Sequence, residues 1–263
     1  MQFDLVVPGD SWLHRLDPRA TLFLVSALLV AALVMRHLVF LAGLLLLTHV
    51  MLLSAGVPWD RLRWLWARMA PLTLFILLLQ PLFASGEGAV LLTVGPVTIT
   101  VGGVWDALSF ALRANAMAFT AAILLFVTDQ QDLVRGLVRL GLPYDYGMTF
   151  SLALRYLPTT YGLWLSISDA QRVRGWTPER QHWWERLRAY LPVLVAVVIA
   201  SLRFSDELGL ALAARGFGAS HPRSVWHEVR FAAADWVVCA AVALFLAALL
   251  LARFAAGWGA VPV

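Results

Sequence analysis

Two short Arg-Gly strings have residue types that could bind a partner protein. Val173-Arg174-Gly175 ends one stretch with a helical pattern, and Ala214-Arg215-Gly216 ends the next. A guanidinium can bind a carboxylate through two hydrogen bonds, and a glycine can close a helix in the left-handed conformation. We therefore predict that each string presents an arginine at a helix end.

Helix capping alone is the simpler explanation of either string. A cation in the last turn complements the helix dipole by roughly 0.3–1 kcal/mol, so one Arg-Gly does not by itself indicate binding. The two strings share a further feature, because a large aromatic residue, Trp176 or Phe217, follows each glycine. Such a side chain can anchor in a pocket of a partner. The repeated pattern favours docking through Arg174 and Arg215.

The composition assigns the chain to the membrane proteins. Of its 263 residues, 61% are hydrophobic and only 14% are charged, whereas a soluble domain is about half apolar and about a quarter charged. The N-terminal residues lack the apolar run and cleavage site of a signal peptide, so we expect the first apolar segment to be retained. The single cysteine, Cys239, excludes an internal disulfide.

Five segments are candidate membrane spans because a crossing helix needs about 20 mainly apolar residues. They are residues 20–35, 38–57, 69–85, 106–128 and 232–252. Pro81 is expected to kink the third. The predicted fold class is an all-α integral membrane protein with about five transmembrane helices plus long amphipathic cytoplasmic coupling helices.

The arginines indicate the orientation. All 20 basic residues are arginines, and a cytoplasmic N-terminus places nearly all of them on the cytoplasmic side, leaving only Arg36 and Arg253 outside. We therefore predict a multi-pass protein of a bacterial or archaeal cell membrane. In the outer loop, residues 90–101 surround Gly95-Pro96 with β-branched residues; a hairpin is possible, but we expect an exposed connector.

The segment between the fourth and fifth spans is long and basic. We expect a short amphipathic helix after Asp129 that ends at Gly141, and two longer helices over 147–174 and 181–215. The middle of the predicted helix over 181–215 has only about a dozen unbroken apolar residues, which is short for crossing a membrane. We expect it to lie at the cytoplasmic boundary; the alternative is a sixth span. The predicted domains are 1–128 (membrane bundle of about four spans), 129–231 (coupling-helix region) and 232–263 (last transmembrane helix and tail).

Across most of its length the chain resembles the transmembrane T components (CbiQ/EcfT type) of energy-coupling factor (ECF) ABC transporters. The motifs that carry the resemblance are Leu16-Asp17-Pro18-Arg19, Leu140-Gly141-Leu142-Pro143, Ser151-Leu152-Ala153-Leu154-Arg155-Tyr156-Leu157-Pro158, the two Arg-Gly strings and Asp235-Trp236. The strings are similar to the Ala-Arg-Gly motifs of that family. Val173 departs from the small residue usual there, and this puts a tight fit of the first motif in doubt.

The resemblance implies a function and a set of partners. Such subunits join two ABC ATPase subunits, which bind ATP and Mg, to a small membrane S component that captures a vitamin or a transition-metal ion such as cobalt or nickel. The residues implied to couple to the ATPases are Val173, Arg174, Gly175, Ala214, Arg215 and Gly216. Those implied to contact the S component are Leu152, Leu163, Leu194 and Val198. The chain itself is expected to be non-catalytic and to hold no cofactor.

The fourth predicted span contains the polar residues Asp106, Arg113 and Asn115. An ionisable residue inside a span is a functional candidate by default, but Arg113 lies near the outer end, and a structural contact, for example with Asp106, is the preferred interpretation. Asn115 is expected to make a helix–helix hydrogen bond.

The sequence predicts no metal site, no nucleotide site and no nucleic-acid partner, because no ligand spacing, Walker motif or lysine is present. Two other functions were considered: a conventional permease that carries a small solute itself, and a membrane enzyme. Few polar residues are available to line a permeation path, and the cytoplasmic acidic residues do not cluster.

Overall fold

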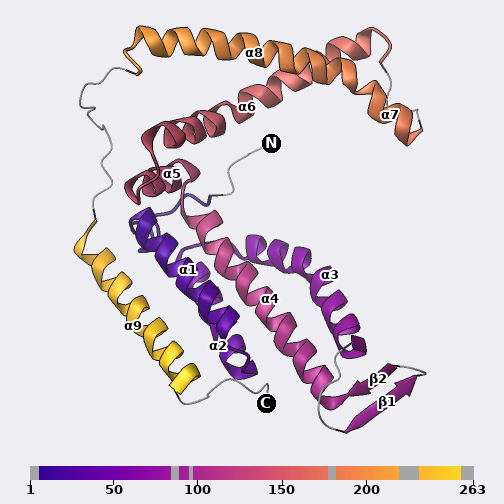
Figure 1. The fold of residues 1–263 in the computed structure, drawn as a ribbon, viewed down its shortest axis with the longest axis vertical. Coiled ribbons are helices and arrows are strands. Elements are labelled where there is room, and N and C mark those ends of the chain that lie inside the picture. The colour runs from indigo at the N-terminus through magenta and orange to yellow at the C-terminus, as the bar shows by residue number, and fades with distance from the viewer. Residues whose placement is uncertain (1–5, 84–88, 95–96, 177–181, 219–230, 256–263) are drawn as a thin grey trace. The chain divides into compact units, whose positions relative to one another are not determined.

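The computed structural model describes residues 6–83, 89–94, 97–176, 182–218 and 231–255 (Figure 1). Its helices and strands are α1 (Pro18–Val34), α2 (Leu38–Ser54), α3 (Trp59–Phe83), β1 (Val90–Val94), β2 (Val97–Thr100), α4 (Val101–Val127), α5 (Gln130–Arg139), α6 (Tyr144–Val173), α7 (Trp183–Ala189), α8 (Leu191–Ala214) and α9 (Ala233–Ala255). Residues 219–230 of the expected coupling region and 256–263 of the expected tail lie outside this description.

The chain divides into two compact units. The first, the bundle unit, comprises Met1–Pro143 and Val229–Val263, and the second, the coupling unit, comprises Tyr144–Glu228. The division differs from the expected domains by one element, because α5 groups with the membrane helices. Gly136 in α5 is buried against the start of α1, where an added methyl group would come within 3.1 Å of Pro18 Cβ.

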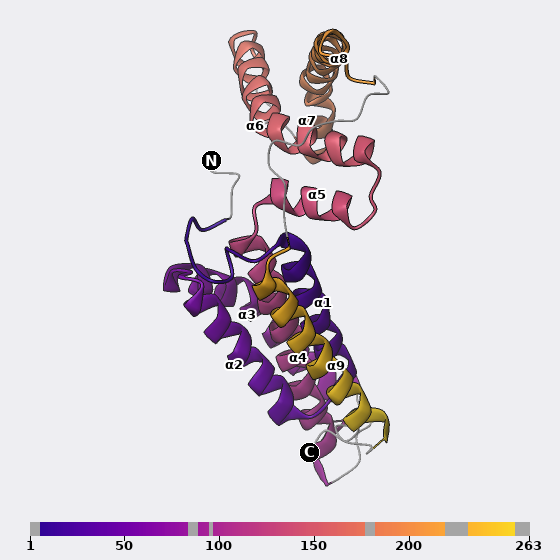
Figure 2. The same ribbon diagram turned by 90° about the vertical axis from the view of Figure 1, so that its left-hand side faces the viewer.

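Helix α4 forms the centre of the bundle unit. It packs against α1, α2 and α3, while α9 packs against α1 (Figures 1 and 2). Small residues on α4, including Ala107, Ala111 and Ala116, are buried and let neighbouring backbones approach closely. Phe119, which is fully buried, contacts the His49 ring of α2 and the Trp66 ring of α3. Apolar packing and ring contacts therefore join three consecutive membrane helices.

The helix lengths agree with a multi-pass protein. Four stretches among the described residues are long and apolar enough to cross a membrane: α3, α4, the α7–α8 stretch Trp183–Ala214, and Ala233–Arg253 of α9. Helices α1 and α2 have 17 residues each and are shorter. The protein is thus an all-α membrane protein, and the five expected spans correspond to α1, α2, α3, α4 and α9.

Three details of the expected elements were wrong. Helix α3 begins at Trp59, ten residues before the expected span, because the Arg- and Trp-rich segment 59–68 continues the helix instead of forming a loop. It has Pro71 and Pro81 in its interior and bends along its length (Figure 1). Val90–Val94 and Val97–Thr100 pair as the antiparallel strands β1 and β2 instead of forming a plain connector, since their β-branched residues favour paired strands. The expectation that the third helix of the basic segment is too short to cross was also wrong, because Trp183–Ala214 is long and apolar enough to do so; its position at the cytoplasmic boundary stays a prediction.

The coupling unit is a pair of antiparallel helices, α6 and α8. The Tyr156 ring meets the Phe204 ring edge-on at 4.9 Å, and the Trp164 ring stacks on the Tyr190 ring at 6.2 Å. Residues further along α6 therefore meet residues earlier in α8, as Figure 1 also shows. The expected third helix is divided at Tyr190, which ends α7 and precedes α8 and its Pro192.

Candidate coupling site

Both Arg-Gly strings form the same hydrogen-bonded helix end. The Gly175 and Trp176 amides donate to the Arg172 and Gln171 carbonyls, each at 3.0 Å. The Gly216 and Phe217 amides donate to Ala213 and Leu212 in the same way, at 2.9 and 3.0 Å. Gly175 has a φ of 89° and Gly216 a φ of 77°, the left-handed values that this Schellman motif requires. The expected closure of both helices by glycine is confirmed.

The arginines themselves are not needed to close the helices. Two other helix ends, at Gly56 and Gly141, have the same pair of hydrogen bonds and a positive φ. The position before the glycine is Ala55 in one and Leu140 in the other. Because the backbone motif forms equally well with an apolar residue there, capping does not explain why Arg174 and Arg215 occupy it.

Both guanidinium groups are available to a partner. Arg174 and Arg215 are exposed, and neither guanidinium group makes a hydrogen bond or an ion pair with any residue that the structure describes. By contrast, Arg172, two residues earlier, lies 3.8 Å from Asp169. Val173 is 90% exposed, so the departure from a small residue at this position puts an apolar side chain on the outer surface.

The two aromatic residues after the glycines have different environments. The Trp176 Nε1–H donates to the Ala189 carbonyl at 2.6 Å, and its ring meets Tyr190 edge-on at 5.2 Å. Trp176 therefore joins the end of α6 to residues 189–190, where α7 ends and α8 begins. The prediction that this side chain anchors in a pocket of a partner was wrong, because the side chain is used within the chain. Phe217 is 40% exposed.

The two arginines lie at opposite ends of the helix pair. Trp176 places the first string beside the start of α8, whereas the second string follows the last residue of α8. Since α8 has 24 residues, the rise of 1.5 Å per residue separates the two ends by about 36 Å. Two exposed cations thus lie at opposite ends of a pair of helices that is joined by ring contacts.

Replacing Gly175 by alanine is expected to fray the end of α6. A side chain at a φ of 89° costs about 1–2 kcal/mol, although the space around Gly175 is open. Amide exchange at Arg174 and Gly175 should accelerate in hydrogen–deuterium exchange. The matched control is Gly162→Ala within α6, where the added methyl group meets nothing within 4 Å and should leave exchange unchanged or slower. Equal exchange in both variants would contradict the cap assignment.

A buried carboxylate joins the first membrane helix of the bundle unit, α1, to the last, α9. Asp235, at the start of α9, is 2% exposed and accepts from the Asp17 amide at 2.9 Å and from the Ala232 amide at 2.7 Å. Asp17, which is 4% exposed, caps α1 and pairs with Arg19 at 3.1 Å. The guanidinium of Arg19 also lies over the Phe231 ring, 5.2 Å from its centre.

Known proteins align with nearly the whole chain. A family model described as cobalt transport protein matches residues 9–225. The energy-coupling factor transporter transmembrane protein EcfT of Bacillus selenitireducens is 31% identical over 95% of this chain and 96% of its own length. The protein of the same name from Listeria innocua is 28% identical over 87% and 89%. This chain belongs to the T-component family of ECF transporters.

A further relative of this T component is larger. A putative ABC transporter ATP-binding protein of Bifidobacterium longum is 30% identical over 92% of this chain, which covers 32% of the length of that protein. A T-component segment therefore forms one third of a chain that is named for ATP binding.

The four residues implied to contact an S component occupy two kinds of position in the T component. Leu194 and Val198 are 50% and 48% exposed. They belong to an apolar stripe at helical spacing on α8, formed by Leu191, Leu194, Val195, Val198, Ile199 and Leu202, each 48–62% exposed. The opposite face of α8 includes Val193, which is fully buried. Leu152 and Leu163 on α6 are half-buried.

Of the polar residues of α4, Arg113 has a different partner from the predicted one, and Asn115 has the predicted kind of partner. Arg113 does not pair with Asp106; its Nη2 donates to the Met35 carbonyl at the end of α1, at 2.9 Å. Seven residues of helix separate Arg113 from Asp106 by about 10 Å, so the side chain turns to the nearer carbonyl. Asn115 donates to Thr73 of α3 at 2.9 Å, the helix–helix hydrogen bond that was expected.

Sequence reasoning missed the roles of Asp17 and Asp235 in this T component. The signals were present, since Asp before Pro is a common helix start and an acidic residue in the first turn of a helix complements its dipole. Those signals are local, and they do not predict that two residues 218 positions apart meet.

Proposed function

We propose that this T component is the energy-coupling transmembrane subunit of an ECF-type ABC importer. In this proposal, Arg174 and Arg215 each enter a groove of one of two ABC ATPase subunits, with Val173, Gly175, Ala214 and Gly216 around them. The observation that carries the proposal is the pair of identical helix ends whose exposed arginines capping does not require. The relative named for ATP binding supports association with ABC ATPases.

The chemistry of the two arginines suits this role. A guanidinium at a helix end can bind carboxylates or carbonyl groups at a groove through several hydrogen bonds in a fixed geometry. ATP and Mg are bound by the ATPases, and their closure moves the two grooves relative to each other. Because Trp176 and the ring pairs Tyr156–Phe204 and Trp164–Tyr190 clamp α6 to α8, motion at one end is passed along a stiff helix pair.

The exposed apolar stripe on α8 supports the second half of the proposal. Leu194 and Val198 of that stripe, together with Leu152 and Leu163, contact a small membrane S component that holds a vitamin or a transition-metal ion. Apolar faces of this kind lie against lipid or membrane partners, while the charged residues Arg203, Asp206 and Glu207 further along α8 remain at the water boundary. The N-terminus and both arginines are cytoplasmic in this arrangement.

Site-directed cross-linking tests the docking. In a Cys239→Ala background, Val173→Cys and Ala214→Cys should each cross-link to an ATPase subunit when the transporter is assembled in native membranes, because both positions are exposed beside an arginine. Asp10→Cys, which is also exposed and predicted to be cytoplasmic, is the control and should give no such product. Cross-links of similar yield from all three positions would contradict docking at the helix ends.

A further inference from the structure

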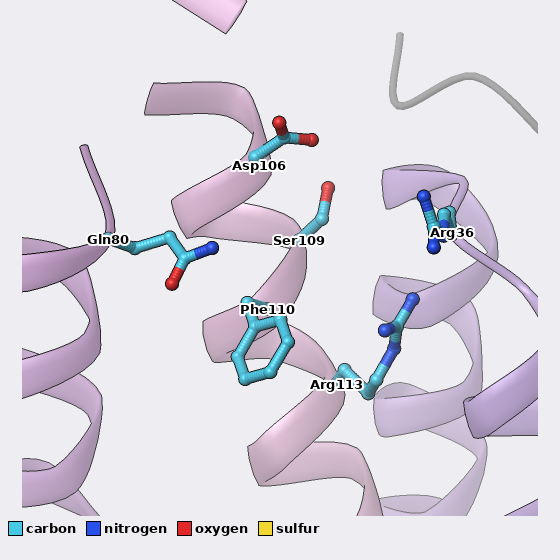
Figure 3. A pocket seen from close by; sticks show the side chains of 6 residues that line it. All are labelled: Arg36, Gln80, Asp106, Ser109, Phe110 and Arg113. Carbon is cyan, nitrogen blue, oxygen red and sulfur yellow. The ribbon is translucent and has the colours of Figure 1, made fainter. Parts of the chain in front are cut away.

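A cavity of about 210 Å³ opens at the end of the bundle unit where α1 ends and α4 begins (Figure 3). Its lining comes from two helices and one connector: Gln80 of α3, Asp106, Ser109, Phe110 and Arg113 of α4, and Arg36 between α1 and α2. This volume is several times the share of about 30 Å³ that a water molecule occupies in the liquid. A small polar group therefore fits inside it.

The cavity brings three charged side chains together without pairing them. Among the described residues, Arg36 and Asp106 make no ion pair or side-chain hydrogen bond. Arg113 uses Nη2 for the Met35 carbonyl and leaves its buried Nε without an acceptor. Its guanidinium carbon lies 5.8 Å from the centre of the Phe110 ring, which holds the group beside the cavity.

A buried hydroxyl also lacks a partner. Ser109 is 5% exposed, and its Oγ makes no hydrogen bond within the described chain. Figure 3 shows this hydroxyl directed into the space between Asp106 and Arg36, with the Gln80 amide reaching toward it from α3. A buried polar group left without a partner costs about 1–3 kcal/mol. The unpaired Ser109 hydroxyl and Arg113 Nε therefore indicate that the cavity receives a polar ligand.

The level of the cavity matches that of lipid headgroups. Helices α1 and α2 have 17 residues, about 25 Å of rise, which is slightly less than the hydrocarbon thickness of about 30 Å. Arg36 lies in their connector, and the bond from Arg113 to Met35 brings the Arg113 guanidinium to the same level. The arginines of the cavity thus lie at the boundary between acyl chains and headgroups.

We propose that this cavity binds a phosphate ester that carries a nearby ammonium group, the chemistry of a phosphoethanolamine headgroup. Arg36 and Arg113 bind the phosphate, and the Ser109 hydroxyl donates to one of its oxygens. Asp106 pairs with the ammonium. A purely anionic headgroup leaves the Asp106 carboxylate unpaired and close to a second negative charge, so the site discriminates by the charge pattern of the ligand.

Ligand binding by the purified full-length chain in detergent tests this assignment, without ATPases or an S component. Dihexanoyl phosphatidylethanolamine, dihexanoyl phosphatidylglycerol and soluble phosphoethanolamine serve as probes, each titrated below its micellar concentration. We expect the phosphatidylethanolamine to bind more tightly than the phosphatidylglycerol. Tighter binding of the diacyl probe than of phosphoethanolamine assigns the site to a lipid, whereas equal binding assigns it to a soluble ester of the same chemistry.

Substitutions separate the two charge contacts. Arg36→Gln removes an exposed guanidinium that makes no hydrogen bond or ion pair within the described residues, so the fold should be preserved, and binding of the ethanolamine probe should weaken roughly tenfold or more. Asp106→Asn should remove the preference for ethanolamine over glycerol. Arg63→Gln, an exposed position on α3, is the matched control and should bind as the unaltered chain does. Unchanged binding in Arg36→Gln, or an unchanged preference in Asp106→Asn, would overturn the proposal.

Discussion

Exchanging Arg174 and Arg215 together for glutamate is expected to abolish co-purification of this T component with the ATPase subunits proposed as its partners and to stop uptake. Each exchange replaces a cation by an anion at the point of docking, so an attractive contact becomes a repulsive one at both ends of the α6–α8 pair. Both side chains are exposed and make no hydrogen bond or ion pair within the described residues, so the protein should still insert and fold. Affinity purification and an uptake assay in whole cells measure the two effects.

A second double variant serves as the control for the change in net charge. Arg63→Glu with Arg68→Glu changes the net charge equally, at exposed positions of α3, and should leave assembly intact. Each single exchange at Arg174 or Arg215 should weaken assembly without abolishing it, since one attached arginine keeps the second groove at a high effective concentration. Normal uptake by the Arg174/Arg215 double variant would refute the proposed coupling.

Replacing Asp235 by alanine is expected to destabilise the bundle unit. The carboxylate accepts from two backbone amides at 2.9 and 2.7 Å, and truncation leaves the Asp17 and Ala232 amides without an acceptor. Hydrogen bonds to a charged group contribute about 1.5–3 kcal/mol each. Even with partial rescue by water, a loss of about 2–4 kcal/mol is expected, visible as a lower midpoint of thermal unfolding in detergent.

Two further variants show how much of the stability loss is due to the hydrogen bonds of the Asp235 carboxylate. Asp235→Asn keeps one carbonyl oxygen as an acceptor but turns an amide NH2 toward a backbone donor, so its loss of stability should be intermediate. Asp10→Ala removes an exposed carboxylate from the N-terminal segment and should change the midpoint little. A midpoint for Asp235→Ala equal to that of Asp10→Ala would show that the contact between α1 and α9 contributes nothing to stability.

Features that depend on local chemistry were predictable from the sequence. Asp129 and Gly141 bracket α5 because the Asp129 carboxylate accepts from the Gln131 amide, and Gly141 adopts a φ of 116°. The closure of α6 and α8 by Gly175 and Gly216 follows from the same rules. The helix–helix hydrogen bond of Asn115 was also predictable, because a buried amide in a membrane helix needs a partner.

Features that depend on distant contacts were not predictable. The partner of Arg113 is a carbonyl at the end of α1, a group that every residue possesses and no motif marks. The hydrogen bond of Trp176 to Ala189 joins residues 13 positions apart, and no local rule distinguishes an exposed aromatic anchor from one that binds within the chain. The β1–β2 hairpin is only two short strands, and apolar runs of that length are equally compatible with a loop.

The coupling unit is inserted, in chain order, between two parts of the bundle unit, and both of these parts contact the start of α1. Gly136 of α5 lies against Pro18, and Asp235 at the start of α9 holds the backbone of Asp17. The chain segments on both sides of residues 144–228 are therefore fastened to adjacent residues of one helix turn. The first and last membrane helices meet without contacts from the segment between them, so the bundle unit is closed by its own residues, and residues 144–228 are inserted between two of its elements in the chain.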